Sequence, residues 1–151
     1  MLRIPVTLVF VLTLLGYESI CLADKTEFLA GTIRFNANNL IIRTEVAASQ
    51  KQRERGLMYR QTLDTDQSML FVFEEQATIR VWMKNTLIPL DILFINQSGQ
   101  IVSMLRGLSP CKQTNCPVYQ SAQPASFMLE VNAGFIEQHR IQVGQQLKLP
   151  F

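Results

Sequence analysis

Two stretches of this sequence carry the residues whose types could do chemistry. The first runs from residue 56 to residue 60 and ends in Arg60. The second, residues 81–91, is followed by an apolar run and is rich in polar and charged side chains: Trp82, Lys84, Asn85 and Asp91. A carboxylate, two cations and an amide beside an indole ring suit the binding of a polar ligand. On one interpretation, these five side chains converge on a ligand-binding site.

A second interpretation gives Asp91 a local structural role. Asp91 opens the stretch 92–95, which is apolar on both alternating faces, as in a strand buried on both sides. A carboxylate at the edge of a core needs partners, and buried polar groups usually find them nearby. We favour this reading, in which Asp91 pins the turn before it by accepting bonds from backbone N–H groups and from Asn85 or Lys84.

A catalytic role for the same residues is a further alternative. A hydrolase could use Asp91 with Lys84, or with Glu130 as a second carboxylate, because glycosidases need only an acid and a base. The spacing of these residues does not point to that chemistry. His139, the only histidine, ends a short polar segment, where we expect it to be exposed, and no nucleophile motif accompanies it. We therefore assign no catalytic residue and expect no cofactor.

The cysteines and methionines favour structure over metal binding. Cys111 and Cys116 are separated by four residues, whereas a thioredoxin-like pair has two. A zinc site needs about four ligands, and only His139 could join these thiols. We expect a disulfide that clamps a turn-rich loop and contributes about 2 kcal/mol. Five methionines stand singly in apolar stretches, which favours core packing over copper binding and leaves no expected metal site: Met58, Met69, Met83, Met104 and Met128.

The two polar stretches also carry a family resemblance. Gly56-Leu57-Met58-Tyr59-Arg60 resembles a GLM-x-R signature, and residues 82–94 resemble a longer W/F-MKNT-x-x-P-L-D-x-x-F signature. Both are typical of the domain of unknown function family number 192. The similarity extends from about Arg34 to the C-terminus and includes Leu129-Glu130 and Ala133-Gly134. It implies a small β-rich fold, often exported, and implies no activity.

The N-terminus has the layout of a secretory signal. Arg3 precedes an apolar run, residues 4–15, that is too short for a membrane-spanning helix of about 20 residues. Cys21-Leu22-Ala23 offers small residues for cleavage before Asp24. We expect residues 1–23 to be a signal peptide and residues 24–151 to form one exported domain, periplasmic or secreted, with no membrane span after cleavage. Retention as an anchor and lipid attachment at Cys21 are the alternatives.

The remaining sequence predicts a mainly β domain. Short strand-like stretches alternate with turn signals, as in sandwiches and barrels, which favours a compact jelly-roll-like or barrel-like architecture. Ser49 and Gln52 have the spacing of a capping box that opens a short helix, which Gly56 can close. A second short helix is possible over residues 134–140. The predicted strands are 28–35, 40–46, 69–73, 79–83, 91–95, 101–105, 127–131 and 146–149.

The charge distribution limits the partners. The net charge is +2, and removal of Arg3 and Glu18 with the signal would leave it unchanged. The one dense basic cluster, Lys51, Arg53 and Arg55, fits a solvated helix face better than a nucleic-acid surface. We therefore expect a non-catalytic module of the cell envelope that binds a small polar ligand or a partner protein.

Overall fold

The computed structural model describes residues 27–151, so the expected signal peptide lies outside the described residues. Within 27–151, no helix has the length and apolarity needed to cross a membrane. The elements, in chain order, are β1 (Leu29–Phe35), β2 (Leu40–Ala47), α1 (Gln50–Arg55), β3 (Gln67–Ala77), β4 (Arg80–Trp82), β5 (Leu90–Ile95), β6 (Ile101–Leu108), β7 (Val118–Gln120), β8 (Ala125–Asn132), α2 (Phe135–Gln138) and β9 (Leu147–Lys148).

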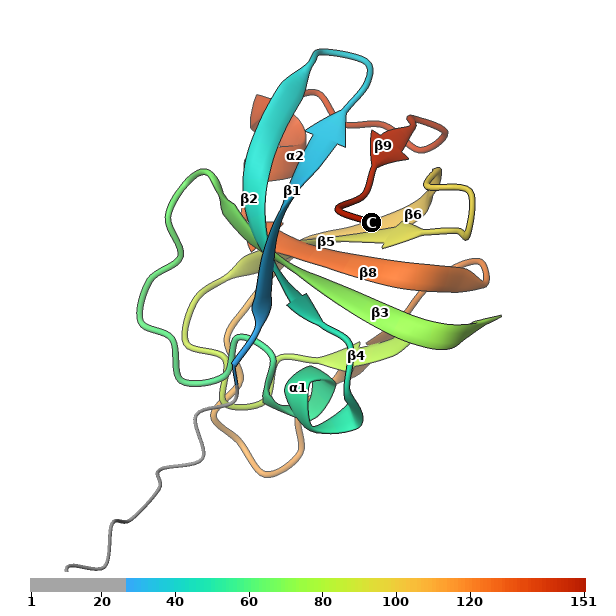
Figure 1. Cartoon of the computed structure of the whole chain (residues 1–151). Coiled ribbons are helices and arrows are strands. Elements are labelled where there is room, and N and C mark those ends of the chain that lie inside the picture. The colour runs from blue at the N-terminus through green and yellow to red at the C-terminus, as the bar shows by residue number, and fades with distance from the viewer. Residues whose placement is uncertain (1–26) are drawn as a thin grey trace, which may run out of the picture.

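The fold is mainly β, as the sequence predicts, with two short helices. Seven strands form one sheet in the order β6-β5-β8-β3-β2-β1-β9, while β4 and β7 form a separate two-stranded ribbon. The large sheet curls into a half-barrel (Figure 1). Its neighbouring strands are antiparallel except β2 and β3, which are parallel and joined through α1. This crossover brings α1 to the side of the sheet.

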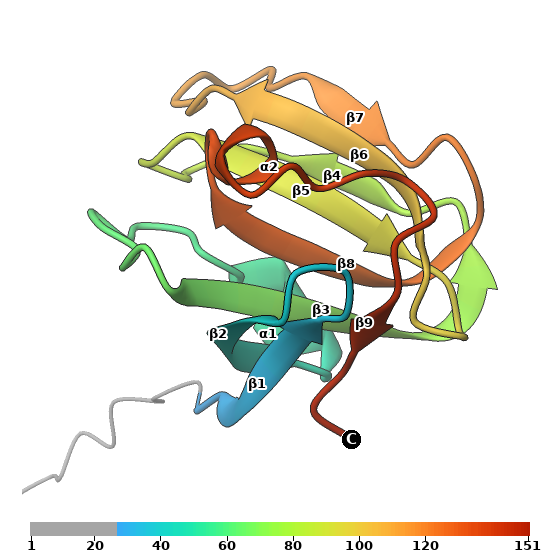
Figure 2. The same cartoon turned by 90° about the horizontal axis from the view of Figure 1, so that it is seen from above.

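The central strands are buried on both faces, because each face of the sheet carries its own core. Along β5, Ile92 and Phe94 belong to one core, and Leu93 and Ile95 to the other. The first core also takes side chains from the β4–β7 ribbon, including Val81. The second is closed by α2 and the C-terminal segment. In Figure 1, α2 lies above the central strands and α1 below them, while Figure 2 shows the same arrangement from above.

Local sequence explains the first half of the chain. The predicted strands 28–35 and 40–46 pair antiparallel as β1 and β2, and Asn39 in the turn between them adopts a positive φ of 54°, a conformation that asparagine tolerates well. The capping box also forms: the Ser49 side chain accepts from the backbone of Gln52, and the Gln52 side chain accepts from the backbone of Ser49. No side chain of α1 is buried. The helix therefore depends on its caps and on contacts at its ends.

Two local expectations need correction. The short strand β7 was not predicted, because Val118 is exposed and three residues carry too little alternation to be recognised. His139 is half-buried, not exposed: it ends α2, and its ring centroid lies 4.4 Å from that of Phe135.

Candidate functional site

Asp91 is bound entirely by the backbone. Its side chain is almost completely buried, with 1% of its surface exposed. One carboxylate oxygen accepts from the N–H of Gly107 at 2.8 Å, and the other from the N–H of Ile136 at 3.0 Å. Asp91 thus ties β5 to β6 and to the start of α2. This is the kind of role that the local interpretation gave it, but Lys84 and Asn85 are not its partners.

The other polar residues of the predicted site each have a different partner. The Lys84 ammonium lies 5.3 Å from the centre of the Trp82 ring, a cation–π contact. Asn85 has a positive φ of 57°, and its side chain donates to the Tyr59 hydroxyl at 2.8 Å. Arg60 forms an ion pair with Glu45, in which Nη1 lies 3.1 Å from Oε1. The structure therefore does not gather these side chains around Asp91.

Cys111 and Cys116 are bonded, with their Cα atoms 5.9 Å apart. The disulfide loop also supports the second polar stretch. The N–H of Cys111 donates to the Met83 carbonyl at 3.1 Å, and its own carbonyl accepts from the N–H of Asn85 at 3.0 Å. The loop therefore holds the turn that follows β4.

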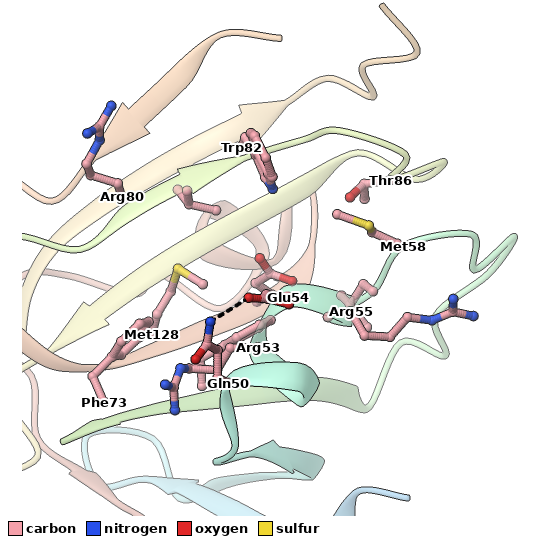
Figure 3. Close-up of a pocket in the computed structure, with 15 residues that line it drawn as sticks. Gln50, Arg53, Glu54, Arg55, Met58, Phe73, Arg80, Trp82, Thr86 and Met128 are labelled. Atoms are coloured by element: carbon pink, nitrogen blue, oxygen red, sulfur yellow. Dashed lines mark hydrogen bonds between the residues drawn. The ribbon is translucent and has the colours of Figure 1, made fainter. Parts of the chain in front are cut away.

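A pocket of about 230 Å³ lies between α1, β4 and the central strands β3 and β8 (Figure 3). Trp82 points into it from β4, and Met128 lines it from β8. Both stretches singled out in the sequence line this pocket. Stretch 56–60 contributes Gly56, Leu57 and Met58, which follow α1, and stretch 81–91 contributes Trp82 and Thr86. The lining residues are Gln50, Arg53, Glu54, Arg55, Gly56, Leu57, Met58, Phe71, Phe73, Arg80, Val81, Trp82, Thr86, Met128 and Glu130.

Two nearly buried polar side chains in this lining have no hydrogen-bond partner among the residues that the structure describes. Glu130 is 6% exposed, and among residues 27–151 nothing forms a hydrogen bond with its carboxyl group. Burial alone raises the pKa of Glu130 to about 8, so the group is mainly protonated at neutral pH and can donate a hydrogen bond. Thr86 is also 6% exposed, and its hydroxyl makes no hydrogen bond within the described part of the chain. Neither group counts as a buried unsatisfied atom, since within residues 27–151 only Gln145 Oε1 does. The Glu130 and Thr86 oxygens therefore reach the open space of the pocket, where a ligand's polar atoms can bond to them.

Glu130 and Asp91 do not form a carboxylate pair. Glu130 lies opposite Ile92 in the ladder between β8 and β5, so it points to the face that carries the first core. Asp91 lies opposite Val131, whose side chain belongs to the core on the other face. Successive side chains of a strand point to opposite faces. The sheet therefore separates the two carboxyl groups, and the two-carboxylate hydrolase geometry is absent.

The wall formed by α1 is held in place by Arg53 and by the glycine that ends the helix. Arg53 Nη1 donates to the carbonyls of Val72, at 3.0 Å, and of Ala48, and its guanidinium carbon lies 5.5 Å from the centre of the Phe73 ring. Gly56 ends the helix with a φ of 43°, and a Cβ there would approach the Phe71 ring to 3.1 Å. Glycine therefore allows the chain to turn close against the floor of the pocket.

A metal centre has no basis in the described residues. No group of three or more histidine, cysteine, aspartate or glutamate side chains within 27–151 could hold a metal ion.

Comparison with known proteins decides the family. The family model DUF192, described as an uncharacterised ACR family, matches residues 32–149. The chain belongs to the DUF192 family. This confirms the resemblance found in the sequence, and it brings no activity with it. No curated protein matches the sequence.

Two solved structures resemble this DUF192 chain. One is a Sinorhizobium meliloti 1021 protein described as a candidate transcription regulator: it is 32% identical, with a TM-score of 0.75, over 82% of this chain and 96% of the other. The second is a protein of unknown function from Novosphingobium aromaticivorans DSM 12444: it is 24% identical, with a TM-score of 0.72, over 81% of this chain and 85% of the other. The second likeness concerns the fold alone.

Sequence reasoning identified only part of the pocket. Trp82 was named as a ligand contact, and Glu130 appeared only as a second acid for catalysis. Thr86 was passed over, although it lies in the polar stretch beside Asn85. The available signal for Glu130 was a single acid inside the apolar run 127–131. Burying a charge there without a partner lowers the stability of the fold, so such an acid is a candidate for a functional role.

Proposed function

We propose that this protein is an exported, non-catalytic module that binds a small molecule in the pocket between α1, β4 and β8. The observation that carries the proposal is that two nearly buried side chains, Glu130 and Thr86, present polar atoms without a partner among residues 27–151 to one pocket of mixed apolar and polar lining. Ligand pockets typically combine mostly apolar walls with a few polar groups that fix orientation. A volume of about 230 Å³ suits a metabolite smaller than a typical drug.

Binding is favoured over catalysis by the chemistry of the lining. A carboxylic acid that stays protonated is a hydrogen-bond donor. Among the described residues, the lining contains no histidine, and its other acid, Glu54, is exposed and accepts a hydrogen bond from Gln50. Export is supported by the disulfide, which persists in oxidising compartments, and by the signal-like N-terminus.

The test uses the single tryptophan of the chain as a reporter. Trp82 is 50% exposed and lines the pocket, so ligand binding should change its fluorescence. We would screen small metabolites by thermal shift, since a ligand of the native state raises the unfolding midpoint, and follow each hit by fluorescence titration. Hits should change Trp82 emission and raise the midpoint of the purified protein.

Matched variants locate the hits. Thr86→Val keeps the shape of the side chain and removes the hydroxyl, and Glu130→Gln keeps a neutral donor but changes its geometry. Both should weaken binding several-fold, whereas Thr32→Val, at an exposed threonine of β1, should leave it unchanged. A screen without hits, or hits indifferent to both pocket variants, would contradict the proposal.

A further inference from the structure

The charged groups around the pocket indicate which ligands it prefers. Arg53, Arg55 and Arg80 line it together with one exposed acid, Glu54, whose carboxylate accepts from Gln50 at 2.8 Å. With Glu130 protonated, the lining carries more positive than negative charge. A site of this sign attracts anions.

Arg53 is the cation best placed to hold an anion. It is half-buried, and its two backbone carbonyl partners and the Phe73 ring fix the guanidinium in place. Those partners occupy only Nη1. A guanidinium has five N–H donors, so Nε and Nη2 retain three that make no hydrogen bond within residues 27–151. The edge formed by Nε and Nη2 matches the two oxygens of a carboxylate.

Glu130 and Arg53 line the pocket from different walls, since Glu130 lies on β8 and Arg53 on α1. Within residues 27–151, no hydrogen bond joins Glu130 to an arginine. A ligand can therefore engage the two groups with different ends. Its body would pass the apolar surfaces of Trp82, Phe71 and Met128.

We propose, on the basis of the binding function above, that the pocket takes a small organic acid with a flat apolar body. Its carboxylate docks on the Nε–Nη2 edge of Arg53, and an uncharged oxygen at its other end accepts a hydrogen bond from the Glu130 carboxyl. The edge of Arg53 supplies charge recognition, and Glu130 supplies recognition of the second polar group.

Three probes that share a 4-hydroxyphenyl group but differ in charge test the organic-acid inference. The probes are 4-hydroxyphenylacetate, its neutral amide 4-hydroxyphenylacetamide and the cationic amine tyramine, each titrated into the purified full chain by calorimetry at pH 7. The carboxylate should bind at least about fivefold more tightly than the amide, and tyramine most weakly, as expected for one partly screened charge-assisted contact. Phenylacetate, which lacks the hydroxyl, should bind more weakly than 4-hydroxyphenylacetate.

Two arginine variants identify the contact. Arg53→Gln should bring the affinities for the carboxylate and the amide within about twofold of each other. Arg55→Gln should keep most of the preference, because the Arg55 guanidinium lies over the Tyr59 ring, 5.1 Å from its centre. Circular dichroism would check that Arg53→Gln is folded, and the wild-type series alone decides if it is not.

The outcomes separate the inference from the proposed function. Equal binding of the carboxylate and the amide, tighter binding of tyramine, or a preference that survives in folded Arg53→Gln would overturn the organic-acid inference. The same holds if none of these probes binds while other metabolites bind at Thr86 and Glu130, in which case the proposed function stands. If no compound binds in the pocket, both fall.

Discussion

Asp91 and Glu130, the two buried acids on neighbouring central strands, point to opposite faces of one sheet. Asp91 has two backbone N–H partners, and Glu130 has no protein partner within the described residues. Opposite environments imply opposite roles. The first acid holds the fold together, and the second is kept at some cost in stability, as expected for a group that serves a ligand.

Removal of the Asp91 carboxylate should strongly destabilise the domain. Asp91→Ala leaves the N–H groups of Gly107 and Ile136 without their acceptor in a buried place, and each such loss costs about 1–3 kcal/mol. We expect a loss of about 3–5 kcal/mol in the free energy of unfolding, measured by urea melts. Asp66→Ala is the control: Asp66 is an exposed partner of Arg43, and its loss should change the free energy of unfolding far less than Asp91→Ala. Similar small losses in both variants would contradict the assignment.

The protonation of Glu130 should make stability fall as the pH rises. The pKa of this carboxyl is about 8 in the folded chain against 4.5 as its ordinary value, so between these values the folded state holds a proton that the unfolded state has lost. The stabilisation from this proton is fully present below about pH 4.5 and is lost by about pH 8. Between these values, the free energy of unfolding falls by up to about 1.4 kcal/mol per pH unit.

Glu130→Gln should remove this slope, because glutamine stays neutral throughout. Urea melts of both proteins at pH 5, 6, 7 and 8 would measure it as the difference between wild type and variant, which cancels the titration of all other groups. We expect the free energy of unfolding of the variant to rise relative to that of the wild type with each step up in pH. A difference that is constant across this range would show that Glu130 is ionised in the folded protein.

Much of the fold could be predicted from the sequence, because its signals are local. The two-sided apolar pattern of residues 92–95 predicted a strand buried on both faces, and all six residues of β5 are buried. Ser49 and Gln52 predicted the start of α1. The pocket could not be predicted in this way. Its walls come from α1, β4 and β8, which are distant along the chain and meet only through the parallel pairing of β2 with β3 and the ribbon of β4 with β7.

The partners of Asp91 show the same limit. Its burial was predicted from its place at the start of an apolar run, but its donors come from β6 and α2, 16 and 45 residues away. Backbone N–H groups carry no signature in the sequence of side chains. Lys84 and Asn85 were the nearest polar residues along the chain, and proximity along the chain was the only available guide.

The disulfide should stabilise the loop more than the domain. Replacing both Cys111 and Cys116 by serine should cost about 2 kcal/mol, because the closed loop is short. Alkylation of the native protein without reductant should label neither thiol. Since Cys111 also bonds to the backbone of Met83 and Asn85, the double variant should alter Trp82 fluorescence while circular dichroism shows the sheet intact. Free thiols in the exported protein would contradict this prediction.

The N-terminal prediction is tested by mass. If residues 1–23 are a cleaved signal, the exported protein should have the intact mass of a chain that starts at Asp24. A mass that includes Met1–Ala23 would indicate a retained anchor. A lipid-sized increment on Cys21 would indicate a lipoprotein.

The floor of the pocket is buried in the sheet, whereas the wall formed by α1 is not, and this difference has an evolutionary consequence. The floor lies on β3 and β8, in the middle of the sheet, whereas α1 contributes a wall with no buried side chain. Changes on such a helix have small effects on folding. Descendants of this chain can therefore exchange Gln50, Glu54 or Arg55 and drift toward new chemical preferences while the sheet stays under purifying selection. Divergence in ligand choice within one unchanged scaffold is the expected pattern.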